Sequence, residues 1–275
     1  SMFCTGLASS FAAALSMRFI TGMGNGAAVV PMMALTASWF AAQKRGLAAG
    51  IVTAGIGIGL SIGGLVLPFV VKEFGPDGWR YAWFLLGGIV FAFSFVCYAF
   101  LRDDPVEKGT TMYGGTEEKR DRSPVPFFRA WAEVAKRKDV WSLGIVFFMF
   151  GFSYIMYMTF IVVYLTGEIG LSPQLAGKIF ALLGFVSIVS GILWGGISDR
   201  LGRRYGLALS YGALALACLI PVYWRGTAGF CLSAMVFGLT LAAAPSIMTA
   251  TIGDLVGGRL VPAALGVITV MFGTG

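Results

Sequence analysis

Long apolar runs, separated by short polar breaks, follow one another along nearly the whole chain. A bilayer hydrocarbon core about 30 Å thick takes about 20 apolar helical residues for each crossing, and the runs reach that length. They lack the strict alternation of a membrane barrel, and open strands would leave backbone groups unpaired in lipid. We therefore predict an all-α, polytopic membrane protein of about eight full spans with partial spans at both ends. The expected spans are a partial one up to Ala14, others near 16–40, 46–72, 80–101, 140–166, 173–197, 205–224 and 227–251, and one that begins near 261.

The polar breaks alternate between a strongly basic side and a weakly basic one. The basic side carries Lys44 and Arg45, the long segment 102–138, the arginines between 200 and 204, and Arg259. Because Lys and Arg collect in cytoplasmic loops, this side is expected to face the cytoplasm. The pattern thus predicts a multi-pass protein of the cell (inner) membrane.

Residues 102–138 form a long polar segment that mixes charges of both signs with several prolines and glycines. Such a composition is typical of a flexible connection between two compact parts. We expect a cytoplasmic linker that joins an N-terminal half, residues 1–101, to a C-terminal half, residues 139–275. The end of this linker, from Phe127 to Lys138, is either a basic, aromatic helix on the inner leaflet or an ordinary solvated segment. The sequence leaves both open.

Composition places most of the chain in lipid and removes several functional classes. Of its 275 residues, 57% are hydrophobic and 12% are charged, which gives more apolar surface than a soluble core of this size could bury. The net charge of +7 does not indicate nucleic-acid binding, because the basic residues fall in loops between apolar spans. The chain has no His and 4 Cys without CxxC spacing, so we expect no metal site and no cofactor.

The most specific motif is GGISDRLGRR, which begins at Gly195 and lies in a basic break between two spans. Glycine permits close helix approach, Asp199 can accept hydrogen bonds from a neighbouring helix N-terminus, and the arginines hold positive charge at the membrane surface. The motif resembles the GxxxDRxGRR signature of the major facilitator superfamily, here in the second half. The alternative is that the arginines only anchor topology and that Asp199 is solvated. The gating residues that the resemblance implies are Gly195, Asp199, Arg200, Gly202, Arg203 and Arg204.

A second motif, RFITGMGNG, begins at Arg18 near the start of an apolar span. An unpaired guanidinium at the centre of a span would cost at least about 2.5–3.5 kcal/mol, so Arg18 should face water, a carboxylate or a ligand. The motif resembles the fourth helix of the superfamily, an arginine followed by a glycine run. In that reading Arg18 lines the central cavity and binds an anionic substrate or a coupling carboxylate. The alternative is that Arg18 snorkels to the outer interface.

A third feature is a glycine-rich stretch within the expected span 46–72. No strand precedes it, so a phosphate-binding loop is rejected. Gly55, Gly59 and Gly63 repeat at GxxxG spacing, which predicts close packing of another helix on their face. The stretch resembles the glycine-rich fifth helix of the superfamily, although the proline of its GPxxGG element is missing, which weakens any inference of antiport.

Further polar side chains within the spans are candidates for contact with a substrate. Tyr154 and Tyr157 share a helix face at spacing i and i+3, where they either present hydroxyls to a cavity or pack in an aromatic belt. No Asp or Glu lies near the centre of a span, so a membrane-buried carboxylate that binds a coupling proton is not expected in this chain. The expected substrate-binding residues are Arg18, Asn25, Tyr154, Tyr157 and Ser246.

The resemblance covers the whole chain and implies an incomplete twelve-helix transporter. Residues 1–101 would hold helices three (partial) to six, and residues 139–275 helices seven to eleven (partial), so that helices one, two and twelve are absent. In this fold the two halves rock around a site near the bilayer midplane.

The function that the resemblance implies is secondary active transport, as a symporter or antiporter, and Arg18 favours a small organic anion. The expected partners are a small-molecule substrate, a coupling proton or ion and the lipid bilayer, with the protein as a monomer. The alternatives are efflux of an apolar drug or metabolite by the same fold and a non-transporting membrane sensor or receptor. An enzyme is not expected, because the spans hold no His and no acidic pair for acid/base or metal chemistry.

Overall fold

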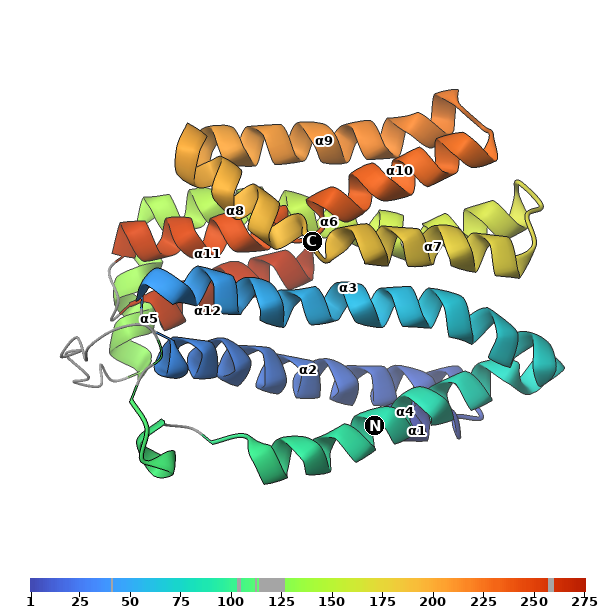
Figure 1. Ribbon diagram of the computed structural model, residues 1–275, viewed down its shortest axis with the longest axis horizontal. Coiled ribbons are helices and arrows are strands. Elements are labelled where there is room, and N and C mark those ends of the chain that lie inside the picture. The colour runs from blue at the N-terminus through green and yellow to red at the C-terminus, as the bar shows by residue number, and fades with distance from the viewer. Residues whose placement is uncertain (41, 103–104, 112, 114–126, 257–259) are drawn as a thin grey trace. The chain divides into compact units, whose positions relative to one another are not determined.

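The computed structural model consists almost wholly of helices, and it describes residues 1–40, 42–102, 105–111, 113, 127–256 and 260–275 (Figure 1). The predicted linker residues 114–126, the predicted basic residue Arg259 and the side chains of Lys44 and Arg45 lie outside the described part of the chain. The helices are α1 (Met2–Thr5), α2 (Phe11–Trp39), α3 (Ala42–Glu73), α4 (Gly78–Phe100), α5 (Phe127–Ala135), α6 (Lys138–Gly167), α7 (Pro173–Ser187), α8 (Ser190–Leu201), α9 (Arg203–Tyr223), α10 (Thr227–Thr240), α11 (Ala243–Val256) and α12 (Val261–Thr274), with 3-10 turns η1 (Gly75–Asp77) and η2 (Pro105–Lys108).

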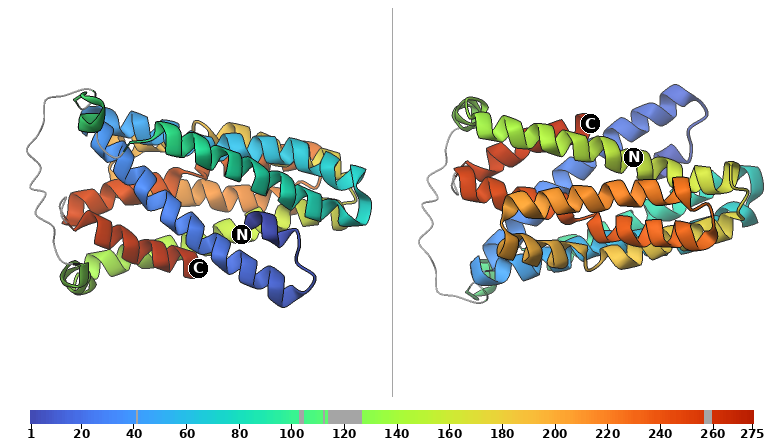
Figure 2. Two further views of the ribbon diagram at one scale, coloured as in Figure 1. Left: turned by 90° about the horizontal axis from the view of Figure 1, so that it is seen from below. Right: turned by 90° about the horizontal axis from the view of Figure 1, so that it is seen from above.

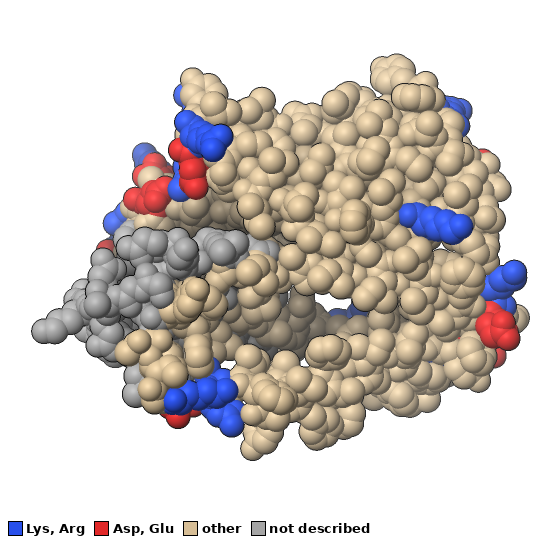
Figure 3. Space-filling view, viewed as in Figure 1, with Lys and Arg blue, Asp and Glu red and all other residues tan. Residues whose placement is uncertain are grey.

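Among the described residues, 5 segments are long and apolar enough to cross a membrane, and the bent pair α7–α8 makes a sixth when it is counted as one span. On the face drawn in Figure 3, Lys, Arg, Asp and Glu gather near the helix ends, and the surface between them is largely uncharged. The predicted all-α membrane class is therefore confirmed. The five segments are Ile51–Glu73, Gly75–Phe100, Lys138–Gly167, Arg203–Tyr223 and Thr227–Val256.

The chain forms two compact units, of which the first comprises Ser1–Ala49 and Leu65–Lys119. In this unit α1 packs on α4, where a Cβ at Gly87 would lie 2.6 Å from the backbone nitrogen of Phe3. The guanidinium of Arg80 in α4 donates to the carbonyls of Gly6 and Ala8, at 2.9 Å each. These bonds satisfy backbone acceptors in the turn after α1 and hold it against α4.

The second unit comprises Gly50–Gly64 and Arg120–Gly275. In this unit α6 packs on α12, and α10 packs on both α7 and α9. Figure 1 and the right view of Figure 2 show α9 and α10 as neighbouring antiparallel helices. Aromatic side chains fill the space between α6 and α12, where the rings of Phe147 and Phe272 stack with centroids 4.8 Å apart. A buried apolar core is thus shared by α5, α6, α7, α9, α10, α11 and α12.

The middle of α3 packs against α7 through Gly57 and Gly64, which are not among the glycines named from the GxxxG spacing. Among the described residues, nothing lies within 4 Å of a Cβ built at Gly55 or Gly59. A Cβ at Gly57 would instead lie 2.6 Å from the carbonyl oxygen of Gly184, and one at Gly64 would lie 2.7 Å from that of Gly177. At about 100° of rotation per residue, Gly57 and Gly64 are turned by about 200° and about 180° from Gly55, so they lie on the opposite face of α3.

The last part of the predicted linker is a helix docked on the second unit. Ala130 and Val134 of α5 are buried, and Trp131 lies partly buried beside the main core next to α12. After α5 ends, the guanidinium of Arg137 donates to the carbonyl of Leu255 in α11 at 3.0 Å. The sequence left open whether this segment is a helix on the inner leaflet or a solvated linker. In the structure, part of it is packed against protein.

Two predicted spans are interrupted. The span expected at 173–197 is divided into α7 and α8, which are bent by 44° at residues 188–189. The span expected at 227–251 is divided into α10 and α11 at residues 241–242. Pro245 accounts for the second interruption, because it has no N–H to donate to the carbonyl of Leu241 and its ring crowds that carbonyl.

Candidate functional site

The GGISDRLGRR motif forms the turn from α8 to α9. Gly202 sits between the two helices with φ of +91° and ψ of 151°, a backbone conformation that side-chain-bearing residues rarely adopt. This turn places Arg203 at the first position of α9, directly beside the end of α8. The helices approach most closely at Gly206, where a Cβ would lie 2.8 Å from that of Ser198. A Cβ at Gly195, where close approach was predicted, has no described atom within 4 Å.

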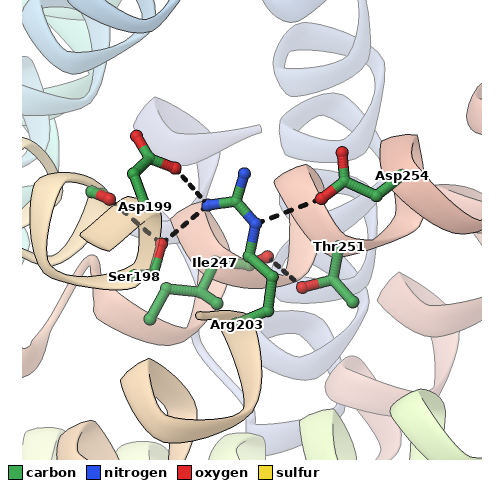
Figure 4. A network of polar contacts seen from close by, with 7 residues as sticks. Ser198, Asp199, Arg203, Ile247, Thr251 and Asp254 are labelled. Carbon is green, nitrogen blue, oxygen red and sulfur yellow. Dashed lines mark hydrogen bonds and ion pairs between the residues drawn. The ribbon is translucent and has the colours of Figure 1, made fainter. Parts of the chain in front are cut away.

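Arg203 joins three helices through its guanidinium (Figure 4). It donates to Oδ1 of Asp199 at 2.5 Å and to Oγ of Ser198 at 2.8 Å, both on α8. It also donates to Oδ2 of Asp254, near the end of α11, at 3.2 Å. The donor to Asp199 is therefore a side chain, whereas the sequence suggested a backbone donor from a helix N-terminus. Arg200 and Arg204 are exposed.

The network is open to solvent. The side chain of Arg203 is 30% exposed, and those of Asp199 and Asp254 are 65% and 63% exposed. Solvent screening limits each ion pair at such exposure to about 1 kcal/mol or less. Contacts of this strength can form and break readily, which suits a contact that differs between two conformations.

Asp254 was not assigned a role from the sequence, because it lies 51 residues after its partner Arg203. An acidic residue at the end of an apolar span, on the same side of the membrane as the arginine-rich motif, is the one signal that points to it. That signal gives no partner, since several arginines lie on this side.

Arg18 lies on α2 with its guanidinium stacked over the indole of Trp83 from α4. The distance from the guanidinium carbon to the ring centroid is 4.2 Å, within the range of a cation–π contact. In the part of the chain that the structure describes, no carboxylate lies within ion-pair distance of Arg18. Stacking engages the flat face of a guanidinium and leaves the N–H groups along its edge able to bind an anion.

Asn25 lies on the same side of α2 as Arg18, since seven residues make almost two helical turns. Gly22 lies between them on this face, and nothing described lies within 4 Å of a Cβ built there. Arg18 and Asn25 are both exposed. This face of α2 thus presents a cation and an amide, separated by a position with no side chain.

The tyrosines of α6 pack in the core of the second unit. The ring of Tyr157 is stacked on Phe237 with centroids 3.9 Å apart, and the residue is 8% exposed. Its hydroxyl bonds to Oγ of Ser233 at 2.7 Å, and Ser233 donates to the carbonyl of Ala217 at 2.6 Å. Tyr154, partly buried, stacks on Phe237 at 6.4 Å. Of the two interpretations left open by the sequence, packing describes Tyr157 in this structure.

The remaining predicted residue, Ser246, lies on α11 beside the start of α8. Its Oγ would lie 3.4 Å from a Cβ built at Gly191, and Oγ1 of Thr53 from α3 would lie at the same distance. Three helices thus meet at this point with small or hydroxyl side chains. Across the described residues, no three His, Cys, Asp or Glu side chains gather so as to hold a metal ion.

Comparison with known proteins gives a consistent result over the whole chain. Residues 1–275 match the family described as Major Facilitator Superfamily. The chain is 27% identical to the probable sulfoacetate transporter SauU of Cupriavidus necator, over 76% of this chain and 49% of that protein. It is 24% identical to the hexuronate transporter of Bacillus subtilis, over 78% of this chain and 50% of that protein.

A solved structure shows the same fold. The crystal structure of a bacterial homologue of the human lysosomal transporter Spinster, in an inward-facing and occupied conformation, matches with a TM-score of 0.62 and 17% identity. The match covers 99% of this chain and 62% of the other. The chain spans about half the length of the relatives named above.

Proposed function

The chain belongs to the Major Facilitator Superfamily, and from this premise we propose that it is part of a secondary active transporter for small organic anions. The full-length protein would carry its substrate across the cell membrane by alternating access around a site near the midplane. A proton or another ion would couple the transport. The named relatives are transporters, so the enzyme class is set aside.

The observation that carries the anionic substrate is the environment of Arg18. The residue lies in an apolar helix, where an unpaired charge is costly. Its described partner is the neutral ring of Trp83, and no described carboxylate pairs with its positive charge. A carboxylate, sulfonate or phosphate could bind the edge of the guanidinium through two parallel hydrogen bonds. Asn25, further along the same face, would then bind a hydroxyl or carbonyl group of the substrate.

The relatives support this substrate class. The two proteins named above are described as transporters of sulfoacetate and of hexuronate, which are both organic anions. At 24–27% identity they do not select one anion for this chain. Together with Arg18, they support small organic anions as the substrate class.

The Arg203 network would act as a gate on the side that the positive-inside rule assigns to the cytoplasm. Arg203 connects the α8–α9 turn to the end of α11 through Asp254. Opening that side would require the ends of these helices to separate, and closing it would restore the contact. Asp199 and Ser198 would hold Arg203 in position for this contact.

The proposal is tested by uptake of labelled small carboxylates and sulfonates into proteoliposomes that hold the full-length protein, with an imposed pH gradient. We expect saturable uptake that Arg18→Ala abolishes. Arg225→Ala is the matched control, because Arg225 is an exposed arginine in the turn between α9 and α10, on the same predicted side of the membrane. Uptake that Arg18→Ala leaves unchanged would remove Arg18 from the substrate site.

Absence of flux with every anion would contradict the proposal itself. Flux of apolar compounds out of the vesicles would then indicate a drug or metabolite efflux transporter. Binding of a ligand without flux would indicate a sensor or receptor that retains the fold.

A further inference from the structure

The two interrupted spans of the second unit are interrupted next to each other. Ser190, the first residue of α8, directly follows the bend at 188–189 and is fully buried. Its hydroxyl donates to the carbonyl of Leu239 at 2.6 Å and accepts from the N–H of Ala242 at 3.1 Å. These two backbone groups flank the interruption between α10 and α11. The side chain of Ser190 therefore bonds to backbone groups on both sides of the interruption between α10 and α11.

Trp194 reinforces this bridge from one turn further along α8. Its indole N–H donates to the same carbonyl of Leu239 at 2.6 Å, and the residue is 7% exposed. Backbone groups that lack a partner are costly in a membrane, where water cannot replace the lost bond. By bonding to these backbone groups, Ser190 and Trp194 stabilise the interruption between α10 and α11. The bonds form only while the start of α8 stays next to that interruption.

The same two helices are also tied at their other ends. Asp199 of α8 and Asp254 of α11 are linked through Arg203. Between the two ties, Trp194 packs with Ala243 and Ile247 of α11 in a small apolar cluster that is separate from the main core of the unit. Helices α8 and α11 are therefore in contact next to the interruptions and linked through Arg203 at their far ends.

Beyond the interruptions, α7 and α10 form a second closely packed pair. A Cβ at Gly238 of α10 would clash with the carbonyl of Leu183 of α7, so the two backbones are in direct contact there. The interruptions at 188–189 and 241–242 therefore separate one packed pair, α7 and α10, from another, α8 and α11.

We propose that Ser190 and Trp194 form a joint, and that α8 and α11 swing about it when the protein changes its conformation, while the two segments stay adjacent at the joint itself. Bending at 188–189 and 241–242 then moves the far ends of both helices, and the Arg203 network holds those ends together while the gate is closed. The joint itself is a property of the fold. Its role in transport rests on the function proposed above.

A reversible disulfide across the joint tests whether α8 and the α10–α11 interruption stay adjacent there. A Cβ built at Gly191 lies 3.6 Å from that of Ala242, and disulfides join Cβ atoms about 3.5–4.5 Å apart. The variant carries Gly191→Cys and Ala242→Cys, with Ser in place of Cys4, Cys97, Cys218 and Cys231. We expect the disulfide to form and the oxidised protein to transport at the rate of the reduced protein, within about twofold. The two single-cysteine variants under the same oxidant are the controls.

Two outcomes of this experiment would overturn the joint. Failure of the disulfide to form would mean that α8 and the α10–α11 interruption do not stay adjacent. Loss of transport on oxidation, regained on reduction, would mean that α8 and α11 move against each other at this point.

Hydrogen exchange tests the joint without any transport substrate. In Ser190→Ala, the N–H of Ala242 loses its acceptor and the carbonyl of Leu239 loses one of its donors, so we expect the amides of residues 238–246 to exchange about tenfold faster, with a smaller increase in Trp194→Phe. Ser210→Ala is the control, because Ser210 is a buried serine whose hydroxyl bonds only within its own helix, to Leu207. Equal exchange in the two serine variants would refute the joint. If even the reduced protein shows no uptake, the transport proposal fails while the exchange result still decides the joint.

Discussion

The guanidinium of Arg203 and the carboxylate of Asp254 meet at 3.2 Å and connect the start of α9 with the end of α11. We expect Asp254→Asn to weaken this contact by about 0.5–1 kcal/mol, because both side chains are partly solvated. The helix ends would then separate more often. A single cysteine in place of Ser246 on α11 should react about two to five times faster with an impermeant thiol reagent applied from that side.

The salt dependence of this labelling checks that the effect is electrostatic. At about 1 M salt the Debye length falls to about 3 Å, so the protein with Asp254 should approach the labelling rate of the variant. Asp139→Asn is the control, because Asp139 is an exposed acid in the first turn of α6, on the same predicted side of the membrane. Unchanged labelling in Asp254→Asn would exclude a gating role for the Arg203 network.

Trp83 is expected to position Arg18 for an anion. Trp83→Phe keeps an aromatic face under the guanidinium, whereas Trp83→Leu removes it. A cation–π contact at an exposed site contributes about 0.5–1 kcal/mol, so the leucine variant should raise the KM for an anionic substrate about two- to fivefold, with kcat little changed. The KM of the phenylalanine variant should lie between that of the natural protein and that of the leucine variant. Initial uptake rates over a range of substrate concentrations measure this, and an unaltered KM in Trp83→Leu would contradict it.

Gly202 is expected to tolerate no side chain. With φ of +91° and ψ of 151° it occupies a region that is essentially reserved for glycine, so Gly202→Ala should destabilise the α8–α9 turn by about 1–3 kcal/mol. The loss should appear as a lower Tm of the purified protein. Gly196→Ala is the matched control, since Gly196 is helical and has no described atom within 4 Å of a built Cβ. An equal Tm in the two variants would show that the turn relaxes without strain.

The helices could be predicted from the sequence because lipid requires long apolar runs to be helical. The interruption at 188–189 could not, because no proline marks it and Ser190 resembles any other hydroxyl in a membrane helix. Close packing on α3 was predicted at Gly55, Gly59 and Gly63, whereas the described contacts with α7 are made at Gly57 and Gly64. A stretch with glycines at so many positions contains several possible faces, and only the neighbouring helix selects among them.

In the candidate site, too, local features could be predicted from the sequence, whereas contacts between distant segments could not. The motif around Asp199 and Arg203 is one continuous stretch, so its residues could be named from their resemblance to the family signature. The partners Asp254 and Trp83 come from distant segments, and their side chains carry no mark of the contact they make. Tyr157 shared a helix face with Tyr154, but burial against Phe237 depends on how α10 packs.

Ser233 of α10 replaces a hydrogen bond that a proline removes from α9. In a regular helix the carbonyl of Ala217 would accept from the N–H of residue 221, but Pro221 has none. Ser233 of α10 donates to that carbonyl at 2.6 Å. Its single proton is then used, so the hydroxyl of Tyr157 must be the donor in the bond between them.

This order of donors ranks two variants. Tyr157→Phe removes one donor and leaves the bond to Ala217 intact, so it should cost about 0.5–1.5 kcal/mol. Ser233→Ala leaves both the Ala217 carbonyl and the Tyr157 hydroxyl without a partner in the core, so it should cost about 1–3 kcal/mol. The Tm of each purified variant gives the ranking.

A double-mutant cycle with Pro221→Ala identifies the cause. Alanine at 221 restores an N–H that can donate to Ala217 along the helix, so Ser233→Ala should lower the Tm less in the Pro221→Ala background than in the natural one. Part of its cost remains, because the Tyr157 hydroxyl still lacks its acceptor. If the two substitutions were additive, Ser233 would stabilise the protein through packing alone. Coupling between them would show that α10 supplies the bond that allows α9 to carry a proline within the membrane.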